Sequence, residues 1–175
     1  MANLKDSPKF QKYDDYYTPK SAWENINHII PKDKIIWEGC MLNSYLSQSP
    51  TYLSDLGNNI IYSHDYDILV DSPETEYDMI ITNPPFTTDI KIKILKKLVE
   101  IDKPFIIIMN SLNLFTKYLR QIFEGKMDQM QIITPSEKIH FDKLVDGELI
   151  KTKNCSFYSV YLCYKMNLEN KDLWI

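Results

Sequence analysis

Short apolar runs alternate with stretches of helical periodicity along most of this chain, and together they predict a layered structure. Strands are predicted where apolar side chains cluster, at residues 35–37, 59–63, 77–82 and 104–109. Helices are predicted between these runs, at about 18–29, 44–56, 89–101 and 112–123. This alternation of strand and helix favours an α/β fold with a mostly parallel sheet.

The helix predicted at residues 89–101 has the clearest pattern. Ile90, Ile94 and Leu98 recur on one face, which we expect to be buried. Lysines occupy much of the remaining surface, and we expect them to lie on the solvent side of the helix. They are Lys91, Lys93, Lys96 and Lys97.

Two more stretches, near residues 129–134 and 155–166, predict the last two strands. The second alternates apolar and polar side chains and is long enough for an antiparallel strand near the C-terminus. Residues 1–16 show no clear period and are predicted to form an N-terminal arm. We expect residues 17–175 to form a single domain, because no internal repeat or low-complexity linker divides them.

The composition is that of a soluble globular protein, with 44% hydrophobic and 25% charged residues. The formal net charge of -4 means that binding to a nucleic acid requires a local basic patch. Cys40, Cys155 and Cys163 have no C-x-x-C spacing, which favours a reduced, cytoplasmic protein without a metal site. No apolar segment approaches transmembrane length, so we expect no membrane partner.

Three polar side chains lie at the ends of predicted strands: Glu38, Asp65 and Asn83. Because the carboxyl ends of parallel strands lie at one edge of a sheet, we expect these side chains at the same edge. Ligands of open α/β sheets bind beyond those ends, near the point where the strand order reverses. The sequence therefore predicts a ligand site at this edge.

The most informative motif is the tetrapeptide Asn83-Pro84-Pro85-Phe86. Asn83 is biased to an extended backbone because it precedes a proline, and the two prolines present carbonyl acceptors without backbone donors. The Asn83 side-chain oxygen and the Pro84 carbonyl can thus accept both hydrogens of a planar amino group. Phe86 can stack on the heterocycle that carries this amine. A plain Pro-Pro turn after a strand is the alternative interpretation.

This motif and the order of elements around it resemble class I S-adenosylmethionine-dependent methyltransferases of the N6-adenine type. The chain is similar in particular to compact adenine-methyltransferase-like proteins of large DNA viruses and phages. The resemblance extends from Asp15 to about Met166. It implies a Rossmann-like class I methyltransferase fold, S-adenosylmethionine as cofactor, and adenine in DNA or RNA as substrate. For a viral protein it places the activity in the host cytoplasm or the virion.

The resemblance also implies cofactor-binding residues in two segments near the first predicted strand. Glu38 and Gly39 would border the amino-acid part of the cofactor, with the carboxylate taking its ammonium group. The segment Tyr17-Thr18-Pro19 would border the methionine, and it also reads as a helix start, with Thr18 as cap. Family members usually have a Pro-Phe or glycine-rich stretch after the acidic residue, whereas this chain has one glycine. The alternative is an ordinary strand-to-helix turn.

A third implied cofactor segment follows the predicted strand at 59–63. Asp65 would accept hydrogen bonds from the ribose hydroxyls, as carboxylates do in dinucleotide-binding folds. Asp67 and Ile68 resemble an Asp-Phe-Phe element of the family, in which the carboxylate accepts from the cofactor adenine and the apolar residue packs on its ring. Acidic residues this close together are also common in solvated loops.

Basic residues are concentrated in the connection between the last two predicted strands. Lys138, His140 and Phe141 are the candidate nucleic-acid contacts, in a basic and partly aromatic hairpin. The same connection contains Lys143, Lys151 and Lys153. A solvated surface loop is the alternative. The chain leaves no room for a target-recognition region, so low specificity, a protein partner that supplies recognition, and a structured RNA substrate all stay open.

Two other functions fit the same residues. A protein glutamine methyltransferase uses a similar motif, but more often with tyrosine in the position of Phe86. A non-catalytic, methyltransferase-like partner or scaffold is compatible with the single glycine, Gly39, and with the acidic net charge. Such a protein has no need of an intact motif at residues 83–86. Binding of S-adenosylmethionine discriminates between the enzyme and the scaffold.

Overall fold

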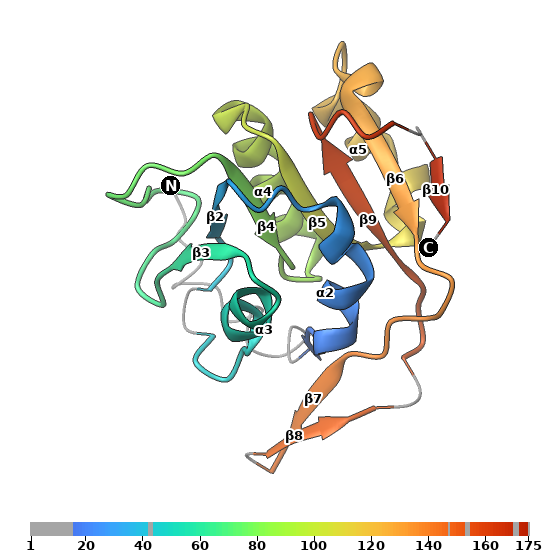
Figure 1. The fold of residues 1–175 in the computed structure, drawn as a ribbon. Helices are drawn as coiled ribbons and strands as arrows, with labels where there is room; N and C mark the ends of the chain where they lie inside the picture. Colours follow the sequence, from blue (N-terminus) through green and yellow to red (C-terminus); the bar gives the residue numbers. More distant parts are fainter. Residues whose placement is uncertain (1–15, 42–43, 147, 153–154, 170–171, 175) are drawn as a thin grey trace.

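The computed structural model describes residues 16–41, 44–146, 148–152, 155–169 and 172–174 (Figure 1). The predicted N-terminal arm therefore lies outside the described residues, except for Tyr16. Lys153, one of the basic residues of the predicted hairpin, lies outside them as well.

A seven-stranded sheet forms the centre of the molecule (Figure 1). In spatial order the strands are β10 (Asp172–Trp174), β6 (Met130–Thr134), β9 (Ser159–Tyr164), β5 (Phe105–Asn110), β4 (Met79–Thr82), β2 (Ile35–Glu38) and β3 (Asn59–Tyr62). The neighbours from β3 to β5 are parallel, whereas β9 is antiparallel to both β5 and β6. This confirms the predicted α/β class, with a mostly parallel sheet and an antiparallel strand near the C-terminus. The sequence pattern did not predict β10, which pairs in parallel with β6.

Helices cover both faces of this sheet (Figure 1). They are α2 (Lys20–Ile26), α3 (Ser49–Asp55), α4 (Thr88–Ile101) and α5 (Lys117–Ile122), with the 3-10 turns η2 (Asn27–Ile29), η3 (Ser111–Phe115) and η4 (Met127–Gln129). Ile94 of α4 and Leu119 of α5 belong to the apolar cluster on one face. Trp23 of α2 and Leu53 of α3 belong to the cluster on the other face. Among the described helices, none combines the length and apolar character needed to cross a membrane.

Two predicted helices have different limits in the structure. The helix expected at 44–56 begins only at Ser49, because Pro50 occupies its first turn and favours a start there. It is followed, as expected, by Gly57 with a positive φ of 81°. The helix expected at 112–123 is divided at Thr116, whose extended backbone separates η3 from α5.

The helix α2 begins after Pro19, which is its N-cap residue, and no side chain caps it. The predicted cap, Thr18, has another role. Its hydroxyl accepts a hydrogen bond from Nδ2 of Asn83 at 3.0 Å. The segment before α2 is thereby joined to the tetrapeptide at residues 83–86.

A small second sheet joins the N-terminal segment to the predicted basic hairpin. Its strands, all antiparallel, are β1 (Tyr16–Tyr17), β7 (Asp142–Val145) and β8 (Glu148–Lys151). The β7–β8 hairpin extends away from the central sheet (Figure 1). Tyr16 pairs with Lys143, whose Nζ lies 4.7 Å from the centroid of the Tyr16 ring.

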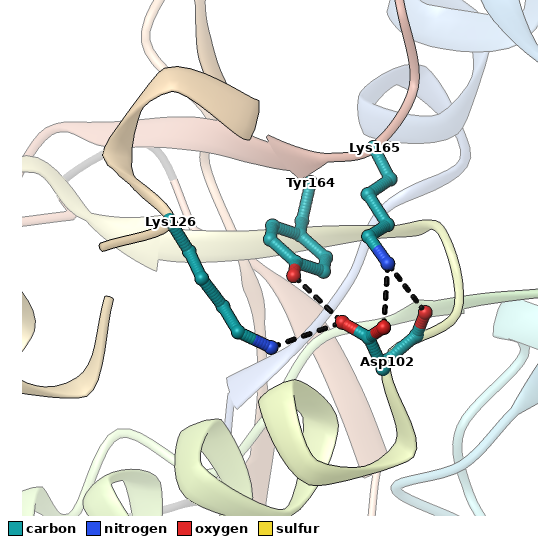
Figure 2. Close-up of polar contacts among 4 residues, drawn as sticks. All are labelled: Asp102, Lys126, Tyr164 and Lys165. Atoms are coloured by element: carbon teal, nitrogen blue, oxygen red, sulfur yellow. Dashed lines mark hydrogen bonds and ion pairs between the residues drawn. The ribbon is translucent and has the colours of Figure 1, made fainter. Parts of the chain in front are cut away.

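Asp102 connects several elements at the amino edge of the central sheet (Figure 2). It follows α4 in the left-handed conformation, with φ 59°. Its carboxylate accepts hydrogen bonds from Lys165 Nζ at 2.6 Å, the Tyr164 hydroxyl at 2.8 Å and Lys126 Nζ at 3.0 Å. These bonds, led by that from Lys165, hold the pKa of Asp102 well below its usual range. The end of α4 is thus joined to β9 and to the segment before β6.

Candidate functional site

Glu38 lies where the strand order reverses. From β2 the chain moves to β3 on one side and then to β4 on the other, so the ligand crevice of such a sheet is expected between β2 and β4. The Thr82 hydroxyl donates to Oε1 of Glu38, and the Cys40 backbone N–H donates to the same oxygen at 3.2 Å. Glu38 is only 2% exposed. Burial, opposed by these two hydrogen bonds, raises the pKa of Glu38 to about 7.

Asn83 leaves β4 beside Glu38 with its side-chain amide held in one orientation. Its Nδ2 donates to Thr18, as described above, whereas its Oδ1 is buried and accepts no hydrogen bond from the described residues. A buried acceptor without a partner is unfavourable unless a ligand supplies the donor. The two following prolines, Pro84 and Pro85, are buried and fix the backbone here. This arrangement can accept a hydrogen from an amino group, which is the chemistry that the sequence predicts for Asn83.

A cleft opens between these residues and the segment before α3. It is lined by Tyr16, Tyr17, Thr18, Glu38, Cys40, Met41, Ser44, Ser47, Ser49 and Asn83. The predicted site residues among them are Tyr17, Thr18, Glu38 and Asn83. Its empty volume of about 280 Å³ includes space that is open to solvent.

The sequence did not predict the three serines of the cleft wall, Ser44, Ser47 and Ser49, because they were assigned to a helix. The chain from 44 to 47 instead forms a turn, in which the Ser47 backbone N–H donates to the Ser44 carbonyl at 3.0 Å. Ser49 opens α3, and its Oγ accepts from Trp23 Nε1 at 3.1 Å. The signal in the sequence was Pro50, which shifts the helix start and leaves polar side chains at the cleft.

Phe86 is packed in a cluster of four aromatic rings. The other rings are those of Tyr16, Phe141 and Phe157, and all pairs of ring centroids lie between 5.0 and 6.1 Å apart. Phe86 and Phe157 are half-buried, whereas Phe141 is completely buried. Phe141 therefore presents no free ring face to a nucleic acid, contrary to the expectation from the sequence. It packs against Phe86 from within the core.

Lys91 contradicts the expectation that the lysines of α4 lie in solvent. It is only 4% exposed, and its Nζ donates to the backbone carbonyl of Phe86 at 3.2 Å. Its position on the helix shows why, since Ile94, Leu95 and Leu98 lie three, four and seven residues later on the same buried face. Lys91 thus attaches α4 to the end of the tetrapeptide.

Replacing Lys91 with methionine is expected to lower the free energy of unfolding by about 1–3 kcal/mol, because the Phe86 carbonyl loses a charged donor. Lys93 is exposed on the same helix, so Lys93→Met should change this free energy by less than about 0.5 kcal/mol. Urea denaturation of both variants measures the difference. Equal stability of the two variants would show that the buried ammonium does not hold the motif.

The residues predicted to contact the cofactor adenine are buried in the loop after β3. Asp67 is 1% exposed, and its Oδ1 accepts from the Leu69 backbone N–H at 3.0 Å, as in an Asx-turn. Ile68 is completely buried, and a Cβ on Gly39 would lie 2.7 Å from its Cδ1. Gly39 therefore makes room for Ile68, which has no free face in this conformation. Asp65 is exposed just beyond the carboxyl end of β3.

Lys138 and His140 lie in the connection between β6 and β7, outside the cleft. Lys138 Nζ is 4.5 Å from the ring centroid of Tyr158, which is 66% exposed and was not predicted as a site residue. An exposed aromatic ring beside an ammonium group is well suited to a nucleic-acid strand. The Nδ1 atom of His140 is buried and has no hydrogen-bond partner among the described residues.

The fold is similar to that of solved methyltransferases. A type I restriction-modification methyltransferase subunit from Streptococcus thermophilus matches 95% of this chain with a TM-score of 0.54 and 14% sequence identity. A protein from Listeria monocytogenes, described as a class I S-adenosylmethionine-dependent methyltransferase, matches 98% with a TM-score of 0.54 and 12% identity. The chain spans 48% of the streptococcal subunit and 68% of the listerial protein.

The TM-scores of 0.54 show a shared fold, and they confirm the expected Rossmann-like architecture of class I methyltransferases. No protein-family model and no curated protein sequence matches the chain.

Proposed function

We propose that this protein is an S-adenosylmethionine-dependent methyltransferase that modifies the exocyclic N6 amine of adenine in DNA or RNA. The side chain of Asn83 carries the proposal, because Thr18 fixes its nitrogen while its buried oxygen has no partner among the described residues. The shared fold supports methyl transfer in general. The choice of adenine rests on the tetrapeptide that contains Asn83.

The cleft beside Asn83 fits the amino-acid end of this cofactor. The buried carboxylate of Glu38 is partly protonated near neutral pH, and an ammonium group placed against it would favour its charged form. The hydroxyls of Ser44 and Ser47 line the same cleft and can donate to a carboxylate. Asp65, three residues beyond the end of β3, would accept from ribose hydroxyls. When bound, the cofactor supplies an electrophilic methyl group.

The residues of the motif orient and activate the acceptor amine. Asn83 Oδ1 and the Pro84 carbonyl accept its two hydrogens, which withdraws the nitrogen lone pair from the ring and fixes its direction. Holding the amine in line for attack accounts for much of the rate enhancement expected of such a site. Phe86 stacks on the base, and Lys91 holds the backbone carbonyl of Phe86.

A basic and aromatic surface near this site supports a nucleic acid as substrate. Lys138 and the exposed Tyr158 ring lie together, and His140 belongs to the same connection between strands. Such a local patch is what a chain with a net charge of -4 requires in order to bind phosphates. A protein partner that supplies target recognition is compatible with this surface.

The test begins with isothermal titration of the protein with S-adenosylmethionine, for which we expect binding. Transfer of a tritiated methyl group is then measured with separate pools of DNA, RNA and protein, followed by mass spectrometry of the labelled products. We expect N6-methyladenine in one nucleic-acid pool. Label confined to glutamine in protein would refute adenine as the substrate. Absence of cofactor binding, alone or with a partner, would refute the proposed enzymatic activity.

A non-catalytic scaffold is the second candidate, and the aromatic cluster is the observation that favours it. Tyr16, Phe141 and Phe157 surround Phe86, so in this conformation the ring that would stack on a base is already packed. A scaffold would keep this cluster closed. Methyl transfer by the cofactor-bound protein to an oligonucleotide containing adenine would favour the enzyme.

A further inference from the structure

Ser159 is a buried polar residue that the proposed mechanism does not use. It is the first residue of β9, and the rest of this strand consists of Val160, Tyr161, Leu162, Cys163 and Tyr164. Its side chain is 4% exposed, and its Oγ has no hydrogen-bond partner among the described residues. A buried hydroxyl without a partner is destabilising, so its presence calls for a partner that binds there.

The register of the sheet places Ser159 at the same edge as Asn83. Ser159 pairs with Asn110, the last residue of β5, while Thr82 at the end of β4 pairs with Ile107. Ser159 and Asn83 therefore lie at the carboxyl edge of the sheet, on strands separated only by β5. With neighbouring strands about 4.8 Å apart, β4 and β9 are about 10 Å apart, and the end of β5 lies between them.

The two side chains also share a face of the sheet. Side chains alternate along a strand, so Ser159 is on the face of Tyr161 and Asn83 continues the face of Ile81. Tyr161 and Ile81 belong to the same apolar cluster, on the side covered by α2. Phe86 and Phe157 pack against that cluster as half-buried rings, so a base that enters here displaces a ring contact.

His140 has a third buried side-chain atom without a hydrogen-bond partner among the described residues. Three buried side-chain atoms without a hydrogen-bond partner occur in the described part of the chain: Asn83 Oδ1, His140 Nδ1 and Ser159 Oγ. His140 lies between Ile139 and Phe141, which belong to the cluster on the α2 face. His140 follows β6, which ends at the same edge as β5 because both strands are antiparallel to β9.

We propose that Ser159 is a specificity-determining residue that donates a hydrogen bond to a ring nitrogen of the acceptor base, with His140 as a second polar contact. This inference rests on the proposed function. Once Asn83 and Pro84 have accepted both amine hydrogens, the polar atoms left on adenine are acceptors, which require donors. The Ser159 hydroxyl is such a donor, and an imidazole N–H is another.

The test compares Ser159→Ala with the wild-type protein on oligonucleotides that contain adenine, 1-deazaadenine, 3-deazaadenine or 7-deazaadenine at one position. We expect Ser159→Ala to lower kcat/KM on adenine by about 10- to 100-fold, the value of one buried hydrogen bond. The same variant should lose almost nothing on the one analogue that lacks the bonded nitrogen. The exposed Ser156 provides the matched control, Ser156→Ala, with unchanged kcat/KM.

Two results would overturn the assignment of Ser159. One is an unchanged kcat/KM on adenine, and the other is an equal loss on all four bases, which indicates a packing role. Equilibrium binding of the same oligonucleotides separates this proposal from the proposed function. If Ser159→Ala binds the oligonucleotide more weakly than the wild-type protein does, the contact between Ser159 and the base is supported. If the wild-type protein also transfers no methyl group, the proposed enzymatic activity is rejected while the contact stands. Equal binding by both proteins would reject the contact.

Discussion

Replacing Asn83 with alanine is expected to lower the single-turnover rate of methyl transfer by about 100- to 1,000-fold, the usual loss when one preorganised polar contact to the reacting group is removed. The affinity for S-adenosylmethionine should stay within about threefold, because Glu38 and the serines of the cleft are unchanged. Stability should change little, since the variant loses the hydrogen bond to Thr18 but also removes a buried oxygen that has no partner among the described residues. Rapid-quench kinetics and isothermal titration measure the two quantities.

Thr18→Val is the matched control for this prediction. It keeps the Asn83 oxygen but removes the hydroxyl that accepts from Nδ2 at 3.0 Å, so the amide is free to rotate. We expect a smaller loss of rate, of about 10-fold, which corresponds to one hydrogen bond. A rate for Asn83→Ala equal to that of the wild type would refute the role of Asn83 as acceptor. If the rate for Thr18→Val is as low as that for Asn83→Ala, the main contribution of Asn83 to the rate depends on the orientation of its amide by Thr18.

Glu38→Gln is expected to change cofactor binding and stability in opposite directions. The variant loses the negative charge that we propose for binding the cofactor ammonium, and breaking a buried ion pair of this kind typically costs about 3–5 kcal/mol, or at least a hundredfold in affinity. Glutamine keeps an oxygen for the Thr82 hydroxyl and the Cys40 N–H, so the strand ends should remain in place. Isothermal titration measures the loss of affinity.

The gain in stability follows from the raised pKa of Glu38. Because this pKa is about 7 in the folded protein, against an ordinary value of 4.5 for a solvated glutamate, folding favours the neutral carboxyl. Its stabilising contribution is complete below about pH 4.5 and is lost as the pH rises through about 7. At pH 8 the difference amounts to at most about 3 kcal/mol, which Glu38→Gln should recover. Urea denaturation at about pH 5 and pH 8 checks this, and a variant less stable than the wild type at the higher pH would contradict it.

The strands and the place of the site could be predicted because their signals are local. The apolar runs at 77–82 and 104–109 contain β4 and most of β5. Glu38 ends β2 and Asn83 follows β4, at the same edge of the sheet. The reversal of strand order between β2 and β4 then brings these two side chains to one cleft. The strand order itself is a long-range feature that these local signals do not contain.

The partners of the site residues were less predictable because they depend on contacts between distant segments. Thr18 and Asn83 are 65 residues apart, and nothing in either segment indicates that the hydroxyl binds the amide rather than capping a helix. Tyr16 meets Phe86 only because β1 pairs with β7 in a second sheet. Lys91 was misassigned for another reason. Its charge favoured the solvent side, although its helical position coincides with the buried Ile94 and Leu98.

The hydrogen bonds around Asp102 have a consequence for how such a protein can diverge (Figure 2). They join α4, β9 and the segment before β6 at the edge of the sheet that the proposed chemistry does not touch. The opposite edge carries Asn83 and Ser159, whose buried side-chain oxygens have no hydrogen-bond partner among the described residues. Substitutions at the carboxyl edge can therefore change which substrate is selected without altering the hydrogen bonds around Asp102 at the amino edge.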